Sequence, residues 1–217
     1  RDHANLQGQD LVVVCDGDTM LHARAIEEHL ACLRAGAHMV IPYRFMIEEE
    51  ATKTVDPARV LREGIPRAQL VTPSMEQDLR RRDRRYRRHN FFSRFGLTKP
   101  HKPKLIGGHH AVRFDRLLDV NGFDEEYVGY RFNDDDLARR LRLARPRVTP
   151  AIAVTRIEAF HLYHPVRAPD KLQDAPGYQR WIRTDLPVRC AMGIENGLAQ
   201  PTPTIRRVPA SPASALP

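Results

Sequence analysis

The sequence feature that most constrains the fold is a short apolar run that ends in two aspartates. Leu11–Cys15 is continuously apolar and rich in β-branched residues, and Asp16, Gly17 and Asp18 follow at once. Such a run predicts a buried strand whose C-terminal end feeds a turn, the place where α/β folds bind ligands. Two carboxylates at that turn suit a divalent cation such as Mn²⁺ or Mg²⁺. The alternative is an ordinary Asp-Gly turn.

The spacing of apolar residues beyond this turn predicts alternating strands and helices. Residues 22–35 show helical periodicity that stops at Gly36, and a strand is expected over residues 38–46. A further helix is expected over residues 134–144 and a strand over 148–157. This order predicts an α/β fold with crossover connections. At 217 residues and 41% hydrophobic content, one domain is expected.

Three segments are expected to lie outside the core. Residues 74–104 are polar and basic, which predicts a surface insertion or loop. Residues 171–200 form a C-terminal extension, and the proline-rich residues 201–217 are expected to be a disordered tail. The chain begins with Arg1 and reaches its first apolar run by residue 11, so we expect an incomplete N-terminus.

The formal charge of +8 favours anionic partners. The most basic run, residues 80–88 from Arg80 to Arg88, suits phosphates, nucleic acid or acidic lipid. The nearby aromatic residues do not form a nucleic-acid recognition pattern, so nucleic acid is disfavoured and a solvated segment is the alternative. Three scattered cysteines favour a reducing compartment. We therefore expect a cytoplasmic protein, peripheral on the cytoplasmic face of the membrane if this run binds lipid. An excess of arginine over lysine, 30 to 5, indicates a bacterial source.

Two further clusters carry groups that suit chemistry. Asn133 precedes Asp134, Asp135 and Asp136 at the start of a helix, where an Asn cap with acidic residues in the first turn is one explanation. Three carboxylates exceed that need, so one of them could act as a general base. His161 and His164 lie three residues apart near the C-terminal end of an apolar segment. In an extended segment they would face opposite sides, so we expect one of them to bind a metal.

Four segments, taken in order, resemble the GT-A glycosyltransferases of the family 2 type, especially the galactosyltransferase-like region shared by the β-1,4-galactosyltransferases and polypeptide N-acetylgalactosaminyltransferases. They are residues 12–18 (VVVCDGD), 107–109 (GGH) with 120–130 (VNGFDEEYVGY), 133–141 (NDDDLARRL) and 160–164 (FHLYH). The resemblance implies a GT-A, Rossmann-like nucleotide-diphospho-sugar transferase fold. Residues 1–170 would then be the C-terminal part of its catalytic domain.

The resemblance also implies site roles. Asp134 would be the catalytic base, and Asp18, Asp16 and His164 would bind the metal. The donor would be a nucleotide-diphosphate sugar, with a UDP-sugar favoured, bound by Asp16, Gly17, Asp18 and Gly108. The acceptor, a glycan or a lipid-linked saccharide of polysaccharide biosynthesis, would contact Asn133, Asp135, Gly129 and Tyr130.

Two departures from the family pattern fall on the acceptor side. Asn133 stands where the family usually has glutamate, and residues 130–132 (YRF) replace a more usual Trp-Gly-Gly. The resemblance implies an inverting transfer without a covalent enzyme intermediate. A non-catalytic nucleotide-sugar-binding relative and a basic nucleic-acid-binding protein are the alternatives.

Overall fold

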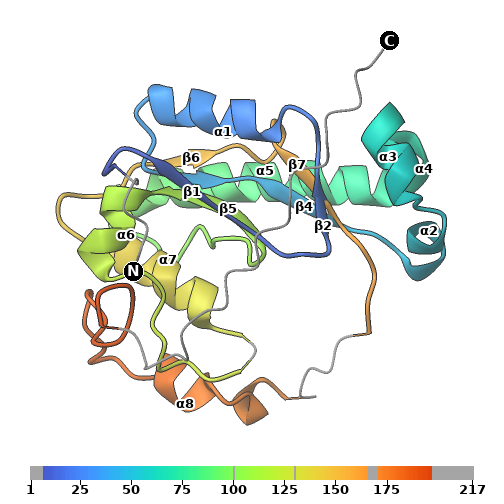
Figure 1. Ribbon diagram of the computed structural model, residues 1–217. Coiled ribbons are helices and arrows are strands. Elements are labelled where there is room, and N and C mark those ends of the chain that lie inside the picture. The colour runs from blue at the N-terminus through green and yellow to red at the C-terminus, as the bar shows by residue number, and fades with distance from the viewer. Residues whose placement is uncertain (1–6, 100, 130, 166–170, 197–217) are drawn as a thin grey trace, which may run out of the picture.

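The computed structural model describes residues 7–99, 101–129, 131–165 and 171–196, and these contain two small sheets (Figure 1). The strand order is β1-β5-β3-β6 in one sheet and β2-β7-β4 in the other. The strands are β1 (Leu11–Cys15), β2 (Thr19–Leu21), β3 (Met39–Ile41), β4 (Tyr43–Met46), β5 (His109–Arg113), β6 (Pro150–Ile152) and β7 (Glu158–His161).

Helices flank the sheets on both sides (Figure 1). They are α1 (Ala25–Arg34), α2 (Glu49–Lys53), α3 (Pro57–Glu63), α4 (Arg67–Leu70), α5 (Pro73–Ser93), α6 (Phe114–Val120), α7 (Asn133–Leu143), the 3-10 turn η1 (Leu172–Asp174) and α8 (Tyr178–Trp181). The expected α/β class is therefore confirmed. Parallel pairing is limited to β3 with β6 and β4 with β7, and the other pairs are antiparallel.

The core has two halves because successive residues of β3 face opposite sides of the sheet. Met39 and Ile41 pack in a cluster with Leu137 and Leu141 of α7. Val40 instead packs with the α1 residues Ala25 and Cys32, on the side that α1 covers in Figure 1. Burial on both faces explains why β3 reads as a continuous apolar run.

The strand predicted over residues 38–46 is two strands. Pro42 separates β3 from β4, and because proline has no backbone N–H it interrupts the ladder. Of the strand predicted over residues 148–157, only Pro150–Ile152 is a strand, β6, and the residues that follow turn into β7, which begins at Glu158. The backbone N–H of Ala153 donates to Ile41 O at 2.9 Å, and that of Tyr43 donates to Ile157 O at 2.8 Å. The chain therefore passes from β3 to β4 beside the passage from β6 to β7, and both passages lead from the four-stranded sheet to the three-stranded sheet.

The prediction of a surface insertion or loop over residues 74–104 is wrong in one respect, because residues 74–93 belong to helix α5. Thr72 caps this helix by accepting a hydrogen bond from Met75 N at 3.4 Å, and Pro73 occupies its first turn. Leu79, Tyr86 and Ser93, spaced seven residues apart, form its buried face. The sequence pattern does not predict this helix because arginines occupy most of its positions and only one narrow face is buried.

The other predicted helices are confirmed with small changes in their ends. Helix α1 is followed by Gly36 with φ of 88°, as a helix stop requires. Helix α7 begins at Asn133, but Phe132 occupies the capping position without a side-chain hydrogen bond, so the expected Asn cap is wrong. The predicted tail, residues 201–217, lies outside the described residues. No helix of the described ranges is long and apolar enough to cross a membrane.

Candidate functional site

A cleft of about 1080 Å³ lies where the two sheets meet the start of α7. Residues from the first strand, the 99–108 segment, the loop before α7, the end of β7 and the C-terminal extension all contribute to its walls. Its lining includes Asp16, Arg44, Lys99, His101, Lys102, Lys104, Gly107, Gly108, Gly129, Arg131, Phe132, Asn133, Asp134, Asp135, His161, His164 and Trp181. Most of the residues predicted for the site therefore line one cavity.

The pairing of β2 with β7 positions Asp18. Thr19 pairs with His161 in the antiparallel register of these strands. One residue outside the ladder, the backbone N–H of Leu162 donates to Asp18 O at 2.9 Å. The turn of residues 16–18 is thereby fixed against the C-terminal end of β7.

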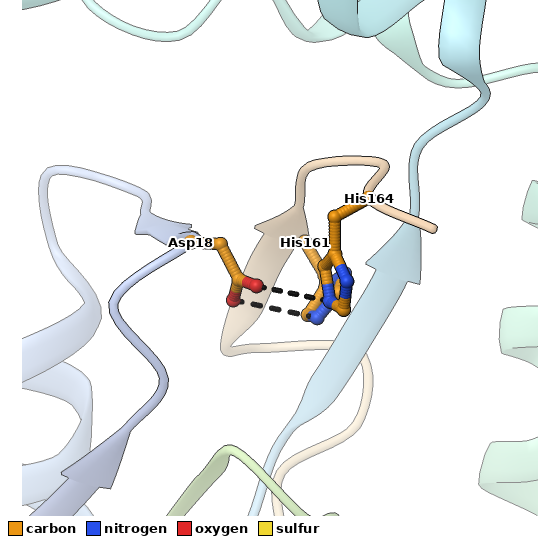
Figure 2. A group of neighbouring side chains, drawn as sticks. All are labelled: Asp18, His161 and His164. Atoms are coloured by element: carbon orange, nitrogen blue, oxygen red, sulfur yellow. Dashed lines mark ion pairs between the residues drawn. The ribbon is translucent and has the colours of Figure 1, made fainter. Parts of the chain in front are cut away.

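Asp18, His161 and His164 converge at this point (Figure 2). His161 Nε2 lies 3.3 Å from Asp18 Oδ1, and His164 Nε2 lies 3.1 Å from Asp18 Oδ2. The three ligand atoms all lie within 4.8 Å of one another. The expectation that the two histidines face opposite sides is wrong, because β7 ends at His161 and His164 belongs to the irregular chain that follows it.

This cluster fits a divalent cation. The Asp18 Oδ1 and His161 Nδ1 atoms are buried and have no hydrogen-bond partner among the described residues. Burial, together with the charge of Arg44, lowers the pKa of His161, so its ring is neutral and free to bind a cation through nitrogen. One carboxylate and two imidazoles form a mixed oxygen and nitrogen donor set, which transition metals such as Mn²⁺ accept.

Asp16 lies apart from this cluster. Its Oδ2 accepts a hydrogen bond from Arg44 Nη1 at 3.0 Å, and its backbone N–H donates to Gly108 O at 2.9 Å. Gly108 has φ of 74°, and a Cβ there would lie 1.8 Å from Asp16 Oδ2. Glycine is thus required for the close approach of these two segments. The metal-binding role of Asp16 stays a prediction.

Asp134 is partly buried on the wall of the cleft. Burial raises the pKa of its carboxyl, and nearby Asp135 and Asp16 act in the same direction against His110 and Arg44. A Cβ on Gly107 would lie 2.7 Å from Asp134 Oδ2. A carboxylate in such surroundings holds a proton more readily than an exposed one, as a general base requires.

The three successive carboxylates of α7 have different surroundings. Asp136 is buried and bonds Arg140 Nε at 2.6 Å, with 1% of either side chain exposed. Asp135 forms an ion pair with Lys104. No hydrogen bond of Asp134 is found among the described residues. Of the three, Asp134 is therefore the carboxylate free to act on a ligand in the cleft.

The acceptor residues predicted from the sequence have a common location. Gly129, Asn133 and Asp135 line the cleft, whereas Tyr130 lies outside the described residues. The Phe132 ring stacks on Trp181 with centroids 5.7 Å apart. The C-terminal extension thus supplies part of the wall, which the sequence reasoning missed because no periodic pattern links Trp181 to the loop before α7.

Sequence reasoning also missed the cations of the cleft. Arg44 comes from β4, and Lys99, Lys102 and Lys104 come from the segment that follows α5. Nothing in the local sequence indicates that Arg44 faces Asp16, since that contact depends on how the two sheets meet. The basic character of residues 99–104 is visible in the sequence, but it predicts a surface loop rather than the wall of a cleft. These cations give the cleft a lining that suits a diphosphate.

Comparison with known proteins identifies the kind of region that carries this cleft. A family model described as the N-terminal domain of galactosyltransferase matches residues 87–165. Residues 87–165 are therefore a galactosyltransferase-like region. The matched residues include Asp134 of α7 and both histidines near the end of β7, and the mixed α/β architecture fits a glycosyltransferase domain.

Curated relatives agree with this assignment. β-1,4-Galactosyltransferase 3 of Homo sapiens and that of Mus musculus are each 29% identical to the chain over 147 residues, covering 58% of the chain and 37% of the relative. The protein of the same name from Cricetulus griseus is 40% identical over 57 residues, covering 26% of the chain and 14% of the relative. The chain therefore spans little more than a third of the length of the first two. These relatives are animal proteins, and the bacterial source inferred from composition stays a prediction.

Proposed function

We propose that this chain is the catalytic part of a metal-dependent, inverting glycosyltransferase of the GT-A fold. It would transfer a sugar from a nucleotide-diphosphate sugar to an acceptor hydroxyl. The observation that carries the proposal is the presence, on one cleft, of His161 and His164 converging on Asp18 and of Asp134, which makes no hydrogen bond among the described residues.

Asp18, His161 and His164 would hold the divalent cation. Mn²⁺ and Mg²⁺ are both candidates, and the two imidazole nitrogens favour tighter binding of Mn²⁺. When bound, the cation supplies neutralising charge for the diphosphate leaving group. Arg44, Lys99, Lys102 and Lys104 would add positive charge around the same group. Asp16, held by Arg44, would contact the nucleotide sugar from the other side of the turn.

Asp134 would remove the proton from the acceptor hydroxyl. The acceptor oxygen then attacks the anomeric carbon in line with the bond to the diphosphate, which breaks as the new glycosidic bond forms. Direct attack inverts the anomeric configuration and needs no covalent intermediate. The raised pKa of Asp134 supports this role.

The same comparison supports a choice of substrates to test. The relatives are named β-1,4-galactosyltransferase 3, so UDP-galactose is the first donor to test, with other UDP-sugars next. The acceptor would be a glycan or a lipid-linked saccharide. Asn133, Gly129 and the stacked pair of Phe132 and Trp181 line the cleft where its sugar rings would lie.

The cytoplasmic membrane surface is the proposed place of action, with residues 80–88 facing anionic lipid. These arginines lie on α5, where Arg82 pairs with Asp78 and Arg87 pairs with Asp83. Such pairing lowers the charge that is free for lipid or nucleic acid, so any membrane contact would depend on the remaining arginines. Vesicle sedimentation with and without anionic lipid would measure it.

Donor hydrolysis and transfer, measured with and without Mn²⁺ over a panel of nucleotide-diphosphate sugars, test the proposal. Turnover that needs the metal and is lost in both Asp18→Asn and Asp134→Asn is the expected result. Donor binding should persist in Asp134→Asn. A chain that binds metal and donor but never turns over would instead be a non-catalytic nucleotide-sugar-binding relative.

A further inference from the structure

A second, smaller cavity of about 280 Å³ lies between the C-terminal end of α5 and the segment that joins α7 to β6. It is lined by Ser93, Gly96, Thr98, Lys99, Arg142, Leu143, Arg145 and Arg147. Four of these eight side chains are cationic and none is a carboxylate. Lys99 also lines the main cleft, so the two cavities share a wall.

Two of the three arginines, Arg145 and Arg147, are positioned by backbone carbonyls, which orient them without neutralising them. Arg145 Nη1 donates to Leu143 O at 3.0 Å and to Ala144 O at 3.1 Å. Arg147 donates to Arg94 O at 3.3 Å and to Ser93 O. The guanidinium groups are therefore held in place while their charge remains available to a ligand.

Among the three arginines of this cavity, Arg142 has a buried guanidinium nitrogen, Nη1, that lacks a hydrogen-bond partner among the described residues. Burial and the neighbouring charge of Arg147 lower the pKa of Arg142 to about 10. A desolvated cation beside like charges is unfavourable unless an anion joins it.

We propose that this cavity binds a phosphate group at a site separate from that of the donor diphosphate. Guanidinium groups offer planar pairs of N–H donors that match phosphate oxygens, and Lys99 and Thr98 add a charge and a hydroxyl. The phosphate is either free in solution or carried by an acceptor that also enters the main cleft, which Lys99 borders.

Direct binding of inorganic phosphate, measured by calorimetry on the whole chain without metal or nucleotide, tests the site independently of glycosyl transfer. Arg145→Gln is expected to weaken binding by about tenfold or more, since a charged hydrogen-bond donor is lost. Arg62→Gln, which removes an exposed arginine from α3, is the matched control and should leave the affinity unchanged. Equal affinity in wild type and Arg145→Gln, or equal weakening by both variants, overturns the proposal.

Arg142→Met adds a readout that does not depend on activity. Removal of a buried, unpaired charge should raise the melting temperature in phosphate-free buffer, and added phosphate should raise the melting temperature of the wild type but not of the variant. A phosphate-induced rise of the same size in both overturns the site. The source of the phosphate follows from transfer rates to matched acceptors with and without a phosphate. A preference for the phosphorylated acceptor that Arg145→Gln abolishes identifies the acceptor, and no preference identifies free phosphate.

Discussion

The backbone N–H of Leu162 donates a hydrogen bond of 2.9 Å to the carbonyl oxygen of Asp18. This bond extends the pairing of β2 with β7 by one step beyond the ladder. It joins an aspartate near the start of the chain to histidines about 145 residues later, and it holds them in register. The pairing of β2 with β7 thus sets the positions of the residues of the proposed metal site.

Loss of a metal ligand should abolish tight metal binding without unfolding the chain. Asp18→Asn, His161→Ala and His164→Ala should each weaken Mn²⁺ affinity by on the order of 100-fold, since loss of an outer-shell partner alone costs 10- to 100-fold. Asp16→Asn should have a smaller effect, because Asp16 is bonded to Arg44. Calorimetric titration with Mn²⁺ and then Mg²⁺ measures both affinities. If Asp16→Asn is as damaging as Asp18→Asn, Asp16 is a metal ligand too.

Asp134→Asn should lower kcat by roughly 10²- to 10⁴-fold, the usual contribution of a general base, and should leave donor affinity unchanged. In the wild type the base must be ionised, so the rate should fall as the pH drops through the pKa of Asp134. Because burial raises that pKa, the acidic limb should lie above the pH at which an exposed aspartate titrates. A limb in the ordinary aspartate range would argue against Asp134 as the base.

Gly108→Ala should destabilise the fold and distort the cleft. The added Cβ would lie 1.8 Å from Asp16 Oδ2 and 2.3 Å from Arg44 Nη1, at a residue with φ of 74°. Backbone strain alone costs about 1–3 kcal/mol, and the displaced ion pair adds to it. Gly17→Ala is the control, because its Cβ would meet no atom within 4 Å. Urea unfolding of the two variants should differ clearly, and similar midpoints would contradict the close packing described at Gly108.

The buried pair of His29 and His109 should make the fold sensitive to acid. Their Nε2 atoms lie 3.2 Å apart. Burial and neighbouring histidines lower the pKa of His29 to about 4 and that of His109 to about 3. The folded-state pKa lies below the unfolded value of about 6.5, so the unfolded chain binds more protons in between. The contribution of these two histidines to the free energy of unfolding should be fully present above about pH 6.5 and should be lost as the pH drops toward 4 and 3.

Between pH 7 and pH 5 the loss should reach roughly 2 kcal/mol for each histidine as an upper limit. Urea unfolding at both pH values measures it. A His29→Met variant should show a shallower dependence, because one of the two groups no longer titrates. An unchanged pH dependence in that variant would mean that other groups cause the acid sensitivity.

Much of the fold could be predicted because its signals are local. Residues 11–15 form a strand with the predicted bounds, and Gly36 ends α1 as expected. Helix α5 was missed because its stripe of Leu79, Tyr86 and Ser93 is narrow and surrounded by charge. The division of residues 38–46 depends on Pro42 standing where two sheets meet, which a single strand pattern does not reveal.

The candidate site was predictable to the extent that its residues stand beside recognisable segments. The sequence indicates Asp18, Asp134 and His164, and all three lie at the cleft or in the cluster of Asp18, His161 and His164 beside it. An extended strand would point His161 and His164 to opposite sides, so the sequence predicts one histidine at the site, whereas the strand ends between them. Arg44 and Trp181 carry no local signal, since only long-range packing brings them to the cleft.

The three short helices α2, α3 and α4, residues 49–70, form a segment whose length can change without altering the main cleft. Among the described residues, none between 47 and 98 lines the main cleft. Arg67 of α4 contacts Glu158 of β7 and the ring of Phe45 in β4, so this segment is packed against the second sheet. The ends of a surface segment held in this way stay fixed while its middle changes length at little entropic cost. A change in the length of the exposed turns between these helices should therefore leave the lining of the main cleft in place.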